Sequence, residues 1–231
     1  MSKKEWIKKN RKKLLIGAVF VIMLVAIINL YQDKRMYERK LSFDLSNDFS
    51  RVMQTIDNGL TMLDTIIEKE EMTYPEHSIL TNGYSDLSMN MQEWRGIANR
   101  FGKFNKEVSN TVSLNAADSR WYIHSFLDQT EVPRIPPDEV AVTLDESQIE
   151  KLTYIRELTE VWAELADEIV PTFSYDGNRV SYDHQGFWDH TGDYNINEDF
   201  WIDFMIEADQ ATEDFLWEEY QVREMRQLLV E

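Results

Sequence analysis

The sequence predicts a mostly α-helical protein, with one N-terminal transmembrane helix followed by an extracytoplasmic bundle of about four long helices that carries a small aromatic hairpin or loop insertion. Three observations lead to this fold class. An uncharged apolar run lies near the N-terminus, at residues 14–31. Four later stretches repeat apolar residues at intervals of three and four, the spacing of a helix with one buried face. Residues that break helices are scarce, because the 231 residues include only 8 glycines and 5 prolines.

The first 31 residues have the features of a signal anchor. Residues 1–13 form a short basic head with seven lysines and arginines against one acid, Glu5. The run LLIGAVFVIMLVAIINLY, residues 14–31, would span about 27 Å as a helix, close to the roughly 30 Å hydrocarbon core of a bilayer. Because positive flanks stay in the cytoplasm, we expect a single-pass protein of the cell membrane, with a cytoplasmic N-terminus and residues 32–231 outside the cytoplasm.

Two other interpretations of this run are weaker. A cleaved signal peptide usually ends in a small-x-small site, and IINLYQDK contains none. A buried core helix would not explain the basic block in front of the run. The following segment, DKRMYERK, has neither glycine nor proline, so we expect the membrane helix to continue as a stalk into the first helix of the bundle.

Four apolar stripes predict the long helices of the bundle. They consist of Leu45, Phe49, Val52, Ile56, Leu60, Leu63 and Ile67; Leu80, Tyr84, Leu87, Met91, Trp94, Ala98 and Phe101; Ile149, Leu152, Ile155, Leu158, Trp162, Leu165 and Ile169; and Phe204, Ala208, Ala211, Phe215, Val222, Met225 and Leu229. Thr143 with Glu146 resembles a capping box for the third helix, and Asn195 with Glu198 for the fourth. A dimeric coiled coil is the alternative, but frequent breaks favour a compact antiparallel bundle.

The segments between the stripes are predicted to hold shorter elements. One or two shorter helices are expected between Phe104 and Gln129, including one through Arg120 to Leu127. The Pro-rich linker EVPRIPPDE, residues 131–139, cannot be helical. The insertion at residues 172–195 places Asp176-Gly177 between aromatic and β-branched residues, which is typical of a hairpin.

Charge is distributed unevenly along the chain. The whole chain has a net charge of -18, whereas residues 41–231 contain 13 Lys and Arg against 39 Asp and Glu, a net charge of -26. An acidic surface of this kind repels phosphate backbones, which excludes nucleic-acid binding as the main role, and it attracts cations or a basic protein partner. The absence of cysteine excludes disulfides, thiolate metal sites and a cysteine nucleophile.

The stretch FWDHTGDYNINEDFW, residues 187–201, is the candidate for a metal site. With His184 just before it, Asp189, His190 and Asp193 supply nitrogen and oxygen donors for a divalent cation. Their spacing matches no zinc motif, and the glycine is misplaced for an EF-hand loop. The alternative is a structural acidic loop that leads into a helix N-terminus. A divalent cation is the one cofactor hypothesis that the sequence raises.

The same region is rich in aromatic side chains, which suit a glycan or another envelope ligand. Aromatic faces beside carboxylates bind sugars, and a pair of carboxylates can hydrolyse a glycoside. In a helical protein such side chains more often belong to the core. The candidate ligand-binding residues are Tyr182, Phe187, Trp188, Tyr194 and Trp201.

Two functional hypotheses follow. The first is a membrane-anchored interaction or sensor/accessory protein of the bacterial cell surface, without catalytic activity, that docks a protein partner or an envelope ligand or associates with itself. The absence of N-x-S/T sequons fits a bacterial origin. The second is a metal-dependent or glycan-acting cell-envelope enzyme that uses residues 183–203. Because the chain lacks a GxSxG motif and a phosphate-binding loop, no catalytic residue is assigned and the first hypothesis is favoured.

Overall fold

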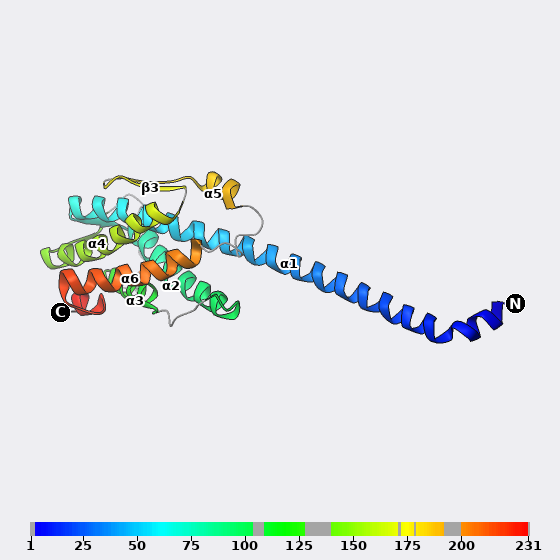
Figure 1. The fold of residues 1–231 in the computed structure, drawn as a ribbon. Coiled ribbons are helices and arrows are strands. Elements are labelled where there is room, and N and C mark those ends of the chain that lie inside the picture. Colours follow the sequence, from blue (N-terminus) through cyan, green and yellow to red (C-terminus); the bar gives the residue numbers. More distant parts are fainter. Residues whose placement is uncertain are drawn as a thin grey trace.

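The computed structural model describes residues 3–103, 109–127, 140–170, 172–177, 179–191 and 200–230. Within these residues, seven helices and four short strands form an elongated molecule, in which a long N-terminal arm extends from a helical body (Figure 1). The mostly helical class predicted from the apolar stripes is confirmed. The helical body consists of the described residues from Leu41 onward.

The first helix, α1 (Lys3–Lys69), forms both the arm and the first element of the body. It contains no proline, and no glycine between Gly17 and Gly59, so no residue in this stretch favours a break. Its apolar segment is long enough to cross a membrane, and none of it is buried against the rest of the chain. Burial begins at Leu41, so the predicted continuation of the apolar helix into the body is confirmed.

The second helix, α2 (Tyr74–Arg100), runs back along α1. Its start is fixed by a capping box, in which the Thr73 hydroxyl accepts the Glu76 N–H and the Glu76 carboxylate accepts the Thr73 N–H at 2.7 Å. The two helices approach closely at Gly83, where a Cβ atom would lie 3.1 Å from a side-chain carbon of Thr55. The next helix, α3 (Thr111–His124), packs against α2 and begins nine residues before the predicted Arg120 start.

A strand pair that the sequence did not predict links the starts of α2 and α4. β1 (Glu71–Thr73) pairs antiparallel with β2 (Val140–Thr143). The predicted capping box of Thr143 with Glu146 is therefore wrong, because Thr143 is a strand residue paired with Glu71. The cap of α4 (Glu146–Ile169) is Asp145, whose carboxylate accepts the Gln148 N–H at 2.8 Å.

The hairpin predicted at Asp176-Gly177 is confirmed. β3 (Phe173–Tyr175) pairs antiparallel with β4 (Val180–Tyr182), and Gly177 has a φ of 88°, a left-handed conformation that glycine adopts without strain. The insertion also contains a helix that was not predicted, α5 (His184–Thr191).

The fourth apolar stripe is divided between two helices, α6 (Phe200–Tyr220) and α7 (Arg226–Val230). The expectation of one helix through Leu229 is wrong because Gln221 adopts a φ of 56°, which ends α6. Met225 and Leu229 are nevertheless buried, so the stripe still faces the core. The predicted linker 131–139 and the predicted cap at Asn195 and Glu198 lie outside the described residues.

One continuous core joins these elements. α1 packs against α2 and α4, α4 packs against α6, and α3 packs against α2 and α6. Its largest fully buried side chains are aromatic, and burial of each such side chain contributes about 1.5–3 kcal/mol. They are Trp94, Trp162, Trp201, Tyr84, Phe49, Phe187 and Phe204.

Candidate functional site: an acidic groove between two helices

Two of the predicted ligand-binding aromatics lie in the interior of the body. Phe187 of α5 and Trp201 of α6 are both 0% exposed. The Phe187 ring stacks on Phe49 of α1 at 5.4 Å with an interplanar angle of 7°. Phe49 also stacks on Trp94 of α2 at 5.2 Å. These contacts give Phe187 a packing role.

Two other candidates lie against α1 and are half-buried. Burial raises the pKa of Tyr182 to about 12, although the nearby Ser50 side chain acts in the opposite direction. The Trp188 ring lies 5.5 Å from Phe43. β4 and α5 therefore hold α1 at the end of the body where the arm begins (Figure 1). Tyr194, the fifth candidate, lies outside the described residues.

The metal-site candidates are only partly described. Asp189 is exposed, and its carboxylate accepts a hydrogen bond from the Gln185 amide at 3.1 Å. His184 and His190 belong to α5, but their side chains, like all of Asp193, lie outside the described part of the structure. In the part that is described, no three His, Asp or Glu side chains are arranged to hold a metal ion. The metal hypothesis at these four positions stays a prediction.

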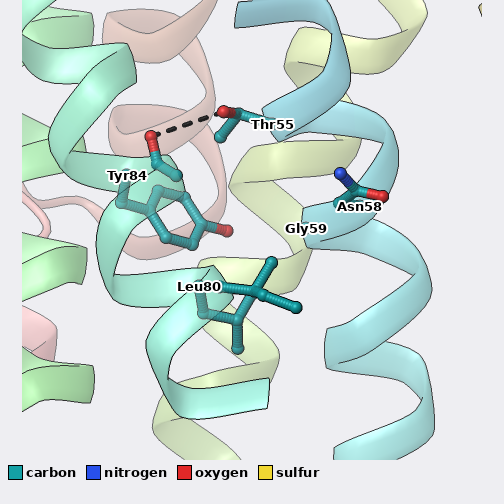
Figure 2. Close-up of a pocket in the computed structure, with 7 residues that line it drawn as sticks. Thr55, Asn58, Gly59, Leu80 and Tyr84 are labelled. Carbon is teal, nitrogen blue, oxygen red and sulfur yellow. Dashed lines mark hydrogen bonds between the residues drawn. The ribbon is translucent and has the colours of Figure 1, made fainter. Parts of the chain in front are cut away.

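A small pocket lies where α1 crosses α2. Figure 2 shows Thr55, Asn58, Gly59, Leu80 and Tyr84 around it, with the Thr55 hydroxyl bonded to the Gly83 carbonyl at 3.4 Å. Its volume of about 40 Å³ has room for a few water molecules at most. The pocket is lined in part by Gly83, where the two helices approach closely. It is too small for an organic ligand.

A larger, open groove lies between α4 and α6, with a volume of about 290 Å³. Trp162 of α4 donates its indole N–H to Thr212 of α6 at 2.8 Å, which fixes the two helices side by side. Four glutamates line the groove around a short apolar floor. The lining residues are Glu157, Glu160, Val161 and Glu164 from α4, and Phe215, Glu219 and Tyr220 from α6.

Tyrosine hydroxyls orient two of the glutamates. Tyr220 donates a hydrogen bond to Glu157, and Tyr175 of β3 donates one to Glu160. Burial, together with the bond to Glu160, raises the pKa of Tyr175 to about 12, so its phenol remains a donor at neutral pH. Arg156 pairs with Glu160 and with Asp64 of α1 at 2.8 Å, on the α1 side of the groove.

The other two glutamates are exposed and carry uncompensated charge. Among the described residues, neither Glu164 nor Glu219 has an ion-pair partner, and no basic residue lines the groove. The carboxylates do not converge on a point that could hold a metal ion. Spread along two helices, they suit separate positive charges, such as the amino and guanidinium groups of a basic peptide segment.

The sequence contains one local signal of this groove. Glu157, Glu160 and Glu164 follow at intervals of three and four, which places them on one face of α4. The contribution of Glu219 could not be foreseen, because it depends on which face of α6 meets α4. No protein-family model, curated protein or solved structure matches this chain.

Proposed function

We propose that this protein is a membrane-anchored, extracytoplasmic accessory protein without catalytic activity, which docks a basic segment of a protein partner in the groove between α4 and α6. The observation that carries the proposal is the lining of the groove, with four glutamates and no basic residue around Val161 and Phe215. The apolar segment of α1 and the seven basic residues before it support the anchor. The net charge of -26 over residues 41–231 would attract such a partner from a distance.

The enzyme alternative has less support. It needs Asp189, His190 and Asp193 to act together, and their spacing matches no zinc or EF-hand motif. Melting curves distinguish the enzyme hypothesis from the docking proposal. They compare the parent chain with an Asp189→Ala/His190→Ala/Asp193→Ala variant in the presence of Ca²⁺, Mg²⁺ or Zn²⁺. Stabilisation of the parent alone by one metal would favour the enzyme hypothesis.

The docking proposal is tested with the full chain in detergent or nanodiscs and a fluorescent lysine- and arginine-rich peptide. Glu164→Lys/Glu219→Lys reverses the two exposed, unpaired charges of the groove. We expect it to weaken peptide binding by about tenfold or more, which is about 1.4 kcal/mol. Binding by the parent should also weaken as salt screens the charges.

The matched control is Glu168→Lys/Glu207→Lys, which makes the same charge change at exposed positions on the same two helices outside the groove. It should retain most of the affinity. An equal loss in both variants would mean that the peptide binds the acidic surface without preference, and the proposed site would be rejected. The anchor is tested separately, by resistance of the chain to alkaline extraction from membranes and by protease access to the body from outside the cell.

A further inference from the structure

We infer that the basic segment docked in the groove between α4 and α6 belongs to a second copy of this chain, so that neighbouring copies associate head to tail. The docking surface of the second copy is called the arginine face. It consists of Leu114, Arg120 and Trp121 of α3, Trp217 of α6, and Arg223 between α6 and α7. The inference rests on the proposed function and names the partner of the same groove.

The arginine face exposes large apolar side chains that the rest of the body leaves uncovered. Leu114 and Trp121 are seven residues apart, which is two helical turns, so both lie on the solvent side of α3. Trp121 is 56% exposed, and Trp217 of α6 is 59% exposed. Tryptophan and arginine are enriched among the residues that dominate binding energy at protein interfaces. The composition of this face is therefore that of a docking surface.

Contacts between the helices bring these residues to one side of the body. The Thr111 hydroxyl, at the start of α3, donates a hydrogen bond to Glu213 of α6 at 2.7 Å. From there α3 packs along α6 and then against α7, so α3 and α6 run in the same direction. Leu114 lies one turn beyond Thr111, and Trp217 lies one turn beyond Glu213. The two exposed side chains are therefore at the same level of adjoining helices.

Two arginines give this face positive charge. Arg120 and Arg223 are exposed, and neither has an ion-pair partner in the part of the chain that the structure describes. Arg226 is not included, because it lies beside the Asp118 carboxylate. Residues 41–231 contain 39 acidic residues against 13 basic ones, so exposed arginines without an acidic partner are unusual on this surface.

The groove between α4 and α6 is the complement of the arginine face. Its two exposed, unpaired carboxylates, Glu164 and Glu219, match the two unpaired guanidinium groups, and each such pair can form two parallel hydrogen bonds. Its apolar floor of Val161 and Phe215 offers a contact for an exposed indole ring. Anchoring in the same membrane also raises the effective concentration of one copy near another. These features favour a second copy as the occupant.

The two surfaces lie on opposite sides of α6, so one copy can use both at once. Trp217 and Glu219 are two residues apart, which separates them by about 200° around the helix. Figure 1 shows α6 running along the length of the body, away from the arm. In the proposed membrane orientation both surfaces therefore face sideways, toward neighbouring copies. A head-to-tail contact of this kind places the arms side by side and extends into rows.

The test measures fluorescence energy transfer between copies of the full chain in liposomes. The chain contains no cysteine, so Gln92→Cys provides a single thiol for a dye at an exposed position of α2. Two variants each reverse the charge of one surface. Arg120→Glu/Arg223→Glu changes the arginine face, and Glu164→Lys/Glu219→Lys changes the groove.

We expect energy transfer between parent copies to exceed the level of random mixing. Each variant alone should associate about tenfold more weakly or worse, because like charges then meet at the contact. A mixture of the two variants, with one dye on each, should recover the transfer. In this mixture the native arginine face of the groove variant meets the native groove of the other variant, which forms pairs in place of rows.

The matched control is Arg100→Glu/Arg179→Glu, which makes the same charge change at exposed positions of the body outside the arginine face. It should associate as the parent does. The inference is overturned if the parent does not exceed random mixing or if the mixture of variants does not recover the transfer. It is also overturned if the groove variant alone still associates, because the contact would then involve another surface, such as two arginine faces or two α1 helices.

The basic-peptide experiment separates failure of this inference from failure of the proposed function. If the groove binds the peptide but the mixture of variants does not associate, the second copy is rejected and the groove is assigned to a different basic protein. If the groove binds neither the peptide nor a second copy, the proposed function itself has failed, and the inference fails with it.

Discussion

Asp209 illustrates at the scale of one residue how a charged group is placed in the core. It lies on α6, is 5% exposed, and its carboxylate accepts the backbone N–H of Val112 at 2.9 Å. Asn110, the residue before α3, makes no capping bond with its own side chain. Asp209 therefore caps α3 from another helix, and burial raises its pKa to about 6, although the bond from Val112 acts in the opposite direction.

This pKa predicts the effect of Asp209→Asn. A carboxyl group whose pKa is higher in the folded state than in the unfolded state stabilises the fold while the group is protonated. This contribution to stability is lost as pH rises through about 6. The asparagine oxygen can still accept the Val112 N–H. As pH rises from acidic to neutral, we expect the unfolding free energy of the variant to increase relative to that of the parent by up to about 3 kcal/mol. Urea unfolding of the full chain in detergent measures this, and a relative loss at neutral pH would mean that the charge at the α3 terminus outweighs its burial.

His77 has the opposite dependence on pH. It is 8% exposed, and its Nε2 atom has no hydrogen-bond partner. Its ring lies 6.3 Å from that of His124 on α3 and 6.5 Å from that of Tyr74 on its own helix. Burial and then the neighbouring His124 lower the pKa of His77, against bonds to the backbone of Ile123 and His124 that raise it.

A histidine with a lowered folded-state pKa contributes stability above its unfolded pKa of 6.5, and this stability is lost as pH falls below that value. His77→Gln removes the contribution. We therefore expect its unfolding free energy, relative to the parent, to rise on acidification, whereas that of Asp209→Asn falls. Unfolding curves of both variants at matched pH values check the two slopes. Slopes of the same sign would contradict the raised pKa of Asp209 or the lowered pKa of His77.

At the scale of elements, β4 and α5 form a clasp on α1. The clasp is fixed by Phe187, which stacks on Phe49 and meets the Phe200 ring edge-on at 5.9 Å. It is also fixed by Trp188, which lies on Phe43. The sequence predicted an aromatic insertion here and treated its aromatics as ligand candidates. Their burial depends on contacts with α1 and α6, which are distant in the sequence.

The clasp predicts a large effect of Phe187→Ala on stability. Loss of a fully buried phenylalanine costs about 3–5 kcal/mol, because the remaining side chains fill the cavity only in part. Gln185→Ala, an exposed position on the same helix, should change the unfolding free energy by less than about 0.5 kcal/mol. Denaturant unfolding of the full chain in detergent measures both. A small effect of Phe187→Ala would show instead that α5 can leave α1 at little cost, as a mobile ligand-binding element would.

Helix ends were the least predictable part of the elements. Thr143 was a reasonable cap for α4 by sequence, but pairing of β2 with β1 extends the strand through Thr143 and moves the cap to Asp145. The start of α4 is therefore set by a strand from another part of the chain, which local propensity does not contain. At Gln221 the sequence has no glycine or proline that would predict the turn.

At the scale of the whole molecule, α1 joins the apolar arm to the core without a break. Its body half contributes Leu45, Phe49 and Ile56 to the core, so movement of the arm about its axis would be resisted by the packed body. In the proposed orientation, α1 connects the membrane anchor to the body that holds the partner groove. A helix interrupted by glycine or proline between them would not provide this.

The sequence by itself determined the helical class, the apolar segment, the faces of α1, α2 and α4 that are buried, and the turn of the hairpin. These features depend on residue type and spacing within one segment, so local physical chemistry is sufficient. Only the tertiary structure decided that Phe187 and Trp201 lie in the core and that Asp209 caps α3. It also brought Glu219 opposite Glu157, Glu160 and Glu164, because these relations depend on how distant helices pack against one another.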